Sequence, residues 1–193
     1  MNLNTLATLK QRLGIDAADT ADDAILSTCL AAVGDRFNNE CNRNFDRASG
    51  TTYEFGAEIK HILVPRYPVE SVSGFELKTT ESEGWVAQTG IDYIIDGPVI
   101  ELAVPLGVRT QRGRVTYTGG YVLPGTTAGA GQTSLPYEIQ QAALDQVAYW
   151  YQNRNQLGIT SLSGQGASRS MFNGLDLLPH VKGALRGYER WLM

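Results

Sequence analysis

The hydrophobic periodicity changes twice along the chain, and this limits the possible folds more than any other feature. Residues 5–42 and 136–157 carry apolar side chains at spacings of three and four, which is typical of amphipathic helices. Between them, residues 51–118 form short runs rich in Val, Ile and Tyr, separated by Gly, Pro and Asp. The connections are too short for helical crossovers, so these strands should be antiparallel. The pattern predicts an α+β fold, a helical bundle of N- and C-terminal helices with an inserted antiparallel β module.

The expected helices have recognisable ends. They cover residues 5–13, 19 or 20 to 42, 136–157, and a closing stretch that starts at Pro179 and continues toward residue 192. Thr5 should cap the first helix and Gly14 should terminate it in a left-handed conformation. Arg190 is placed on the closing helix, near the negative end of its dipole.

The expected strands lie near residues 52–55, 59–64, 69–77, 85–87, 93–95, 99–102 and 114–118. The clearest hairpin turns at Asp96-Gly97. We therefore expect four segments: helices of the bundle in 1–50, the β module in 51–118, a flexible Gly-rich loop in 119–134, and helices completing the bundle in 135–193. Within the last segment, residues 158–174 read as a second loose stretch.

Motifs for catalysis or metal binding are missing from the sequence. There is no G-x-S-x-G, no CxxC, no HExxH and no phosphate-binding glycine motif. His61 reads as a strand residue and His180 as a residue of a helix start. Cys29 and Cys41 lie twelve residues apart on one expected helix, about 18 Å along its axis, too far for a disulfide. We expect no enzyme activity, no cofactor and no metal.

The charge is modest and unevenly distributed. The net charge of the 193 residues is −4, with −7 over residues 1–100 and +3 over residues 101–193. A negative protein is no generic nucleic-acid binder, because phosphate contacts give non-specific affinity. No uncharged apolar stretch is suited to a membrane span, and no secretory leader is recognisable, so we expect a protein used in the cytoplasm where it is made.

Surface chemistry is concentrated in two places. The closing helix carries Arg186, Tyr188, Arg190 and Trp191 within six residues, and these are types enriched in interface hot spots. Arg109, Arg112 and Arg114 lie close together in a stretch that reads either as a solvated hairpin tip or as a contact with another subunit. Both groups are candidate interfaces with another protein chain.

Three separated stretches resemble the head-tail connector (adaptor) family of tailed bacteriophages. The opening LATLKQRLGIDAADTADDAILSTCLAAVGDRFNNECNRNF is similar to the first two helices of that family. VTYTGGYVLPG followed by LPYEIQQAALDQVAYWYQNR resembles its strand, Gly-Tyr turn and Pro-started helix, and LLPHVKGALRGYERW resembles its closing helix. Residues 51–113 do not match the shorter members, so the role of the β module is not carried over.

The resemblance implies a structural virion protein at the head-tail junction. Such proteins form a ring, usually of twelve subunits, beneath the portal protein; the ring extends the DNA channel and offers a docking surface to a stopper or tail protein. It implies contact of the C-terminal residues with the portal, and no catalytic residue. DNA would pass without sequence-specific binding.

Two other functions stay open. The β-rich middle would suit a stopper or tail-completion protein, which binds the far side of the adaptor. A small phage hydrolase or ligand-binding module would need a pocket with convergent polar groups, and substitution of His61 would then abolish an activity.

Overall fold

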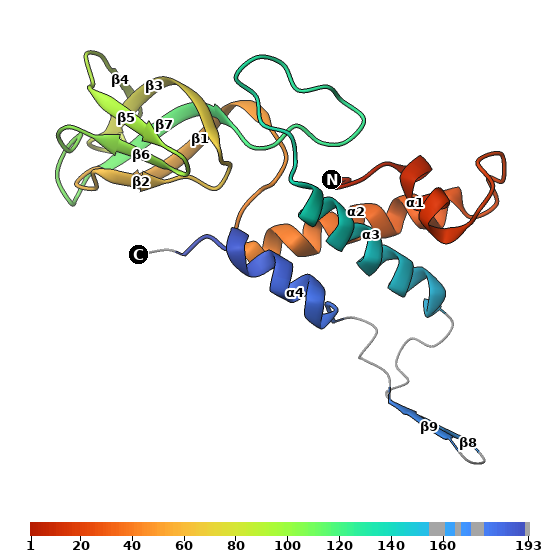
Figure 1. The fold of residues 1–193 in the computed structure, drawn as a ribbon. Helices are drawn as coiled ribbons and strands as arrows, with labels where there is room; N and C mark the ends of the chain where they lie inside the picture. The colour runs from red at the N-terminus through yellow and green to blue at the C-terminus, as the bar shows by residue number, and fades with distance from the viewer. Residues whose placement is uncertain (155–160, 165–166, 171–175, 192–193) are drawn as a thin grey trace. The chain divides into compact units, whose positions relative to one another are not determined.

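The computed structural model describes residues 1–154, 161–164, 167–170 and 176–191, and shows a mixed α+β protein (Figure 1). The chain divides into two compact units. The helical unit comprises Met1–Cys41, Leu123–Gly125 and Leu135–Glu189, and the β unit comprises Asn42–Val122, Thr126–Ser134 and Arg190–Met193. The last residues of the chain therefore belong to the β unit rather than to the helix that precedes them.

Among the described residues, the helical unit contains four α-helices: α1 (Leu6–Leu13), α2 (Asp23–Cys41), α3 (Tyr137–Gln152) and α4 (Pro179–Leu185), the last continued by the 3₁₀ turn η2 (Arg186–Tyr188). The ends of α1 are as predicted. The Thr5 side chain accepts a hydrogen bond from the Thr8 amide at 3.2 Å, and Gly14 takes a left-handed conformation with φ +70°.

The core of the helical unit joins apolar residues from all four helices. Fully or almost fully buried are Leu9, Leu26, Leu30, Val33, Phe37, Ile139, Ala143, Val147, Val181 and Leu185. Gln146 is also fully buried, and both polar atoms of its side-chain amide are hydrogen-bonded. Its Nε2 donates to the Asp176 carbonyl at 3.3 Å, and its Oε1 accepts from the Leu178 amide at 2.9 Å. This buried amide fixes the start of α4 against α3.

Several predicted helix boundaries are wrong. Helix α2 begins at Asp23 because the side chains of Asp16 and Asp19 accept hydrogen bonds from amides two residues later and hold turns there. The closing helix ends at Leu185, and the backbone is extended by Glu189, so Arg190 does not cap a helix dipole. Of the stretch 158–174, predicted to be loose, strands β8 (Ser161–Gly164) and β9 (Ala167–Ser170) form a hairpin, and the rest of the stretch lies outside the described residues.

The β unit contains two antiparallel sheets built from strands close to the predicted positions. These are β1 (Ala48–Gly56), β2 (His61–Leu63), β3 (Val69–Lys78), β4 (Val86–Gln88), β5 (Tyr93–Asp96), β6 (Val99–Leu102) and β7 (Arg112–Gly119). The strand orders are β1-β7-β3-β4 and β2-β6-β5. The hairpin between β5 and β6 turns at Gly97, with φ +54°, and Pro98, so glycine supplies the positive φ of the tight turn.

One apolar core lies between the two sheets. The larger sheet contributes Phe55, Phe75, Val115 and Tyr117, and the smaller sheet contributes Ile62, Ile100 and Leu102. Inward positions alternate with outward ones most regularly in β7, where every second residue from Gly113 to Gly119 is buried. The smaller sheet thus has β2 at one edge and β5 at the other.

The remaining sequence expectations concern the loop, the cysteines and membranes. In the loop 119–134, the Val122 amide donates to the Thr133 carbonyl at 2.8 Å; its flexibility stays a prediction. Cys29 and Cys41 are both free thiols, as predicted. Within the described residues, no helix has both the length and the apolar character needed to cross a bilayer.

Candidate assembly surfaces

The two histidines take part in exposed pairs. His61 Nε2 lies 3.2 Å from Glu101 Oε1 across β2 and β6, and His180 Nε2 lies 3.5 Å from Asp145 Oδ2 in the helical unit. Among the described residues, no group of three or more His, Cys, Asp or Glu side chains is arranged to hold a metal ion. The side chain of His61 is 64% exposed, on the outer face of its sheet. His61 is thus an exposed partner of Glu101 in the β unit.

Arg190 is bonded to the edge of the β unit. Its Nη2 donates to the Leu63 carbonyl at 2.9 Å and to the Tyr53 hydroxyl at 2.8 Å, and its Nη1 reaches the Asn42 carbonyl at 3.5 Å. The guanidinium also lies over the Tyr53 ring, 5.3 Å from the ring centroid. Backbone hydrogen bonds of an antiparallel strand alternate between its two sides. The Lys60 carbonyl and the Val64 amide bond toward β6, so the Leu63 carbonyl points to the free edge of β2.

The other C-terminal candidates differ in exposure. Trp191 follows the bonded arginine directly and is 72% exposed. In the helical unit, Arg186 is exposed and Tyr188 is half-buried. The structure therefore separates the four candidates into an internal contact at Arg190, an exposed aromatic next to it, and two residues of the helical unit.

The three neighbouring arginines also separate. Arg114 is held on the outer face of the larger sheet, with Nη2 2.7 Å from the Glu76 carboxylate and the guanidinium 4.4 Å from the centre of the Trp85 ring. Arg109 and Arg112 are exposed, before and at the start of β7. Their interface role stays a prediction, and Arg109 and Arg112 are the two whose side chains are accessible.

A hollow lies at one end of the smaller sheet, beside the start of β5, the end of β6 and Lys60, which directly precedes β2. It has a volume of about 260 Å³ and is lined by Lys60, Asp92, Tyr93, Ile94, Glu101, Leu102 and Ala103. Ile94 is 68% exposed, a high value for a β-branched apolar side chain on a strand. An exposed apolar side chain beside a concave surface marks a candidate contact with another molecule. We call this feature the β5 hollow.

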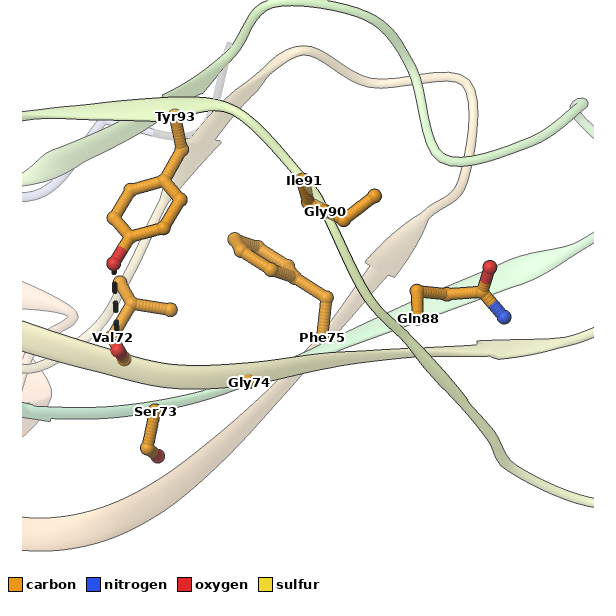
Figure 2. A pocket seen from close by; sticks show the side chains of 8 residues that line it. All are labelled: Val72, Ser73, Gly74, Phe75, Gln88, Gly90, Ile91 and Tyr93. Atoms are coloured by element: carbon orange, nitrogen blue, oxygen red, sulfur yellow. Dashed lines mark hydrogen bonds between the residues drawn. The ribbon is translucent and has the colours of Figure 1, made fainter.

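A second hollow of about 190 Å³ lies between β3, β4 and β5 and is lined by Val72, Ser73, Gly74, Phe75, Gln88, Gly90, Ile91 and Tyr93 (Figure 2). The rings of Phe75 and Tyr93 meet there edge to face, 5.5 Å between centroids, and the Tyr93 hydroxyl lies 3.5 Å from the Val72 carbonyl. Neither of these two hollows is lined by a histidine or a cysteine.

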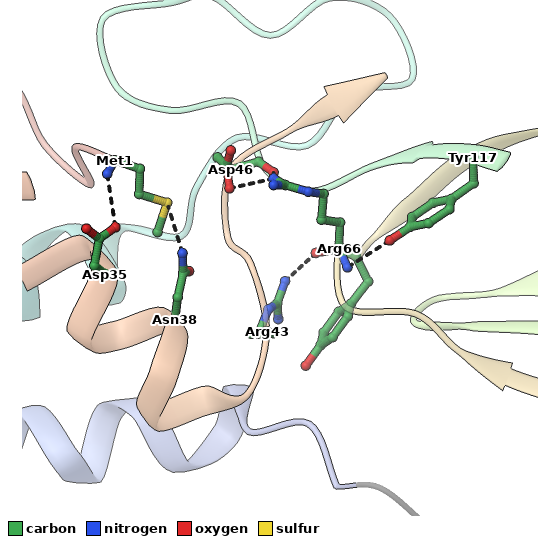
Figure 3. A network of polar contacts seen from close by, with 8 residues as sticks. Met1, Asp35, Asn38, Arg43, Asp46, Arg66 and Tyr117 are labelled. Atoms are coloured by element: carbon green, nitrogen blue, oxygen red, sulfur yellow. Dashed lines mark hydrogen bonds and ion pairs between the residues drawn. The ribbon is translucent and has the colours of Figure 1, made fainter. Parts of the chain in front are cut away.

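Sequence reasoning missed the buried Arg43. It is 3% exposed, stacks 3.4 Å from the centre of the Tyr67 ring, and donates to the Tyr67 carbonyl. Burial lowers the pKa of its guanidinium. Nearby in the same unit, Arg66 Nη1 lies 2.5 Å from Asp46 Oδ1, and the Arg66 amide donates to the Tyr117 hydroxyl at 3.2 Å (Figure 3). Arg43 is thus a buried group of the β unit, and Arg66 is a partly buried one.

Comparisons with known proteins agree with the resemblance seen in the sequence. The family model for head completion proteins matches residues 2–191. Among solved structures, the chain is similar to one described as the neck of an empty GTA particle, a gene transfer agent, computed with C6 symmetry. The TM-score is 0.59 and the identity 16%, over 97% of this chain and 89% of the other. A search among curated proteins finds no match.

Proposed function

Because the chain belongs to the head completion protein family, and its place is the virion at the head-tail junction, we propose that it is a head-tail connector that forms a ring under the portal. Its structural role in the neck is shared with that family. In this proposal the terminal helices make one bundle, the β module is inserted in it, and the ring extends the DNA channel. The family match over nearly the whole chain is the observation that carries the proposal.

The similarity in fold supports a ring. The similar chain comes from a particle neck computed with six-fold symmetry, and its likeness extends over both units of this chain. Six-fold symmetry is compatible with either six or twelve copies, and we propose twelve, as the resemblance implies. A ring needs two different patches on each subunit, because its interface is heterologous and is closed by rotation.

The charge of the protein suits a channel through which DNA slides. The helical unit has seven basic and ten acidic residues, net −3, and the β unit has nine and ten, net −1. The acidic first half and the basic second half of the sequence therefore do not correspond to the two units. With a negative charge on both units, non-specific affinity for phosphates should be low.

We assign the exposed candidates to contacts with the portal or a neighbouring subunit. These are Arg186 and Tyr188 in the helical unit, Trp191 in the β unit, and Arg109 and Arg112 near β7. Arg190 and Arg114 serve the same surfaces indirectly, because their hydrogen bonds inside the β unit hold the segments on which the exposed residues lie.

The seven strands of the β unit favour one alternative, a stopper or tail-completion protein. The two functions differ in the neighbour that is bound. Purified protein should be mixed separately with portal rings and with tail tubes, and the products imaged by electron microscopy. A collar at one pole of the portal ring supports the connector, and its rotational symmetry gives the number of copies.

The same experiment has a clear negative outcome. Binding to tails with no binding to portal rings would replace the connector by the alternative, and binding to neither would contradict both. The exchange Arg186→Glu serves as a charge-reversed variant on an exposed residue of the helical unit. We expect it to weaken portal binding at low salt more than Arg12→Glu, a charge reversal on α1 that also breaks the 3.0 Å ion pair between Arg12 and Asp145.

A further inference from the structure

We draw no further inference here: the strongest candidate, the β5 hollow with the exposed side chain of Ile94 in its lining, carries no proposal, because nothing in the structure, over the residues that it describes, shows what covers it.

Discussion

Replacing Arg190 by alanine should loosen the β2 edge of the smaller sheet. The substitution removes the hydrogen bonds to the Leu63 carbonyl and the Tyr53 hydroxyl, and the stacking on the Tyr53 ring. A hydrogen bond from a charged group contributes about 1.5–3 kcal/mol, and an exposed cation–π contact about 0.5–1 kcal/mol. Because Arg190 is half-buried and the two bonds share one nitrogen, we expect a combined loss of about 2–3 kcal/mol in the stability of this edge.

Amide hydrogen exchange measures this loss at the right place. The Val64 amide donates to the Pro98 carbonyl at 3.2 Å, and the Leu102 amide donates to the Lys60 carbonyl at 2.9 Å, so both report the opening of β2 from β6. Since about 1.4 kcal/mol corresponds to a factor of ten, their exchange should become about 30- to 100-fold faster in Arg190→Ala. Amides between β3 and β7 belong to the other sheet and should change much less.

Arg186→Ala is the matched control, because it removes an exposed arginine four residues earlier in the chain. Arg186→Ala should change the hydrogen exchange rate of the Val64 amide less than twofold. If Arg190→Ala also changes this amide less than twofold, Arg190 does not hold the edge, and the restrained position of Trp191 loses its physical basis. Equal acceleration over the whole β unit would instead show that the sheets open together.

Two further predictions concern the helical unit. A Cβ on Gly34 would lie 2.1 Å from the Met1 carbonyl oxygen, so Gly34→Ala should lower the urea midpoint of unfolding. A Cβ on Gly183 would meet open space, so Gly183→Ala should raise the free energy of unfolding by about 0.5–1 kcal/mol and the urea midpoint with it. The Lys182 ammonium and then the Leu177 amide lower the pKa of Asp176, so this carboxylate stabilises the fold above its unfolded pKa, and the contribution is lost as the pH falls through the lowered pKa. Asp176→Asn should therefore unfold at a lower urea concentration than the parent protein at pH 7. The difference should vanish in acid, at a pH below the usual pKa range of aspartate. A difference that persists there would contradict a stabilising role of the Asp176 carboxylate.

Local patterns were sufficient to predict most of the strands and the first helix. The period of two and the turn residues act over a few positions, so the hairpin at Gly97 and the strands near residues 69–77, 93–95 and 99–102 were found close to their observed bounds. The cap at Thr5 and the terminator at Gly14 are local for the same reason. Where a contact is made within one turn or one hairpin, the sequence around it carries the signal.

Patterns failed where distant residues decide the structure. The apolar spacing continues past Leu185, yet the α-helix ends there, and Arg190 bonds to groups 127 and 137 residues earlier in the chain. Arg114, predicted near a hairpin tip, is held by Glu76, 38 residues away. Ile25 fits the apolar stripe of α2 but is 45% exposed. Periodicity shows which face of an element can be buried, but not whether a neighbour covers it.

The same distinction explains why the candidate surfaces needed the structure. Tyr, Trp and Arg in the closing stretch marked a region rich in interface residue types, but composition could not tell that Arg190 is bonded inside the β unit while Trp191 beside it is exposed. The β5 hollow has no motif, since its lining comes from three separate stretches, around Lys60, Ile94 and Leu102.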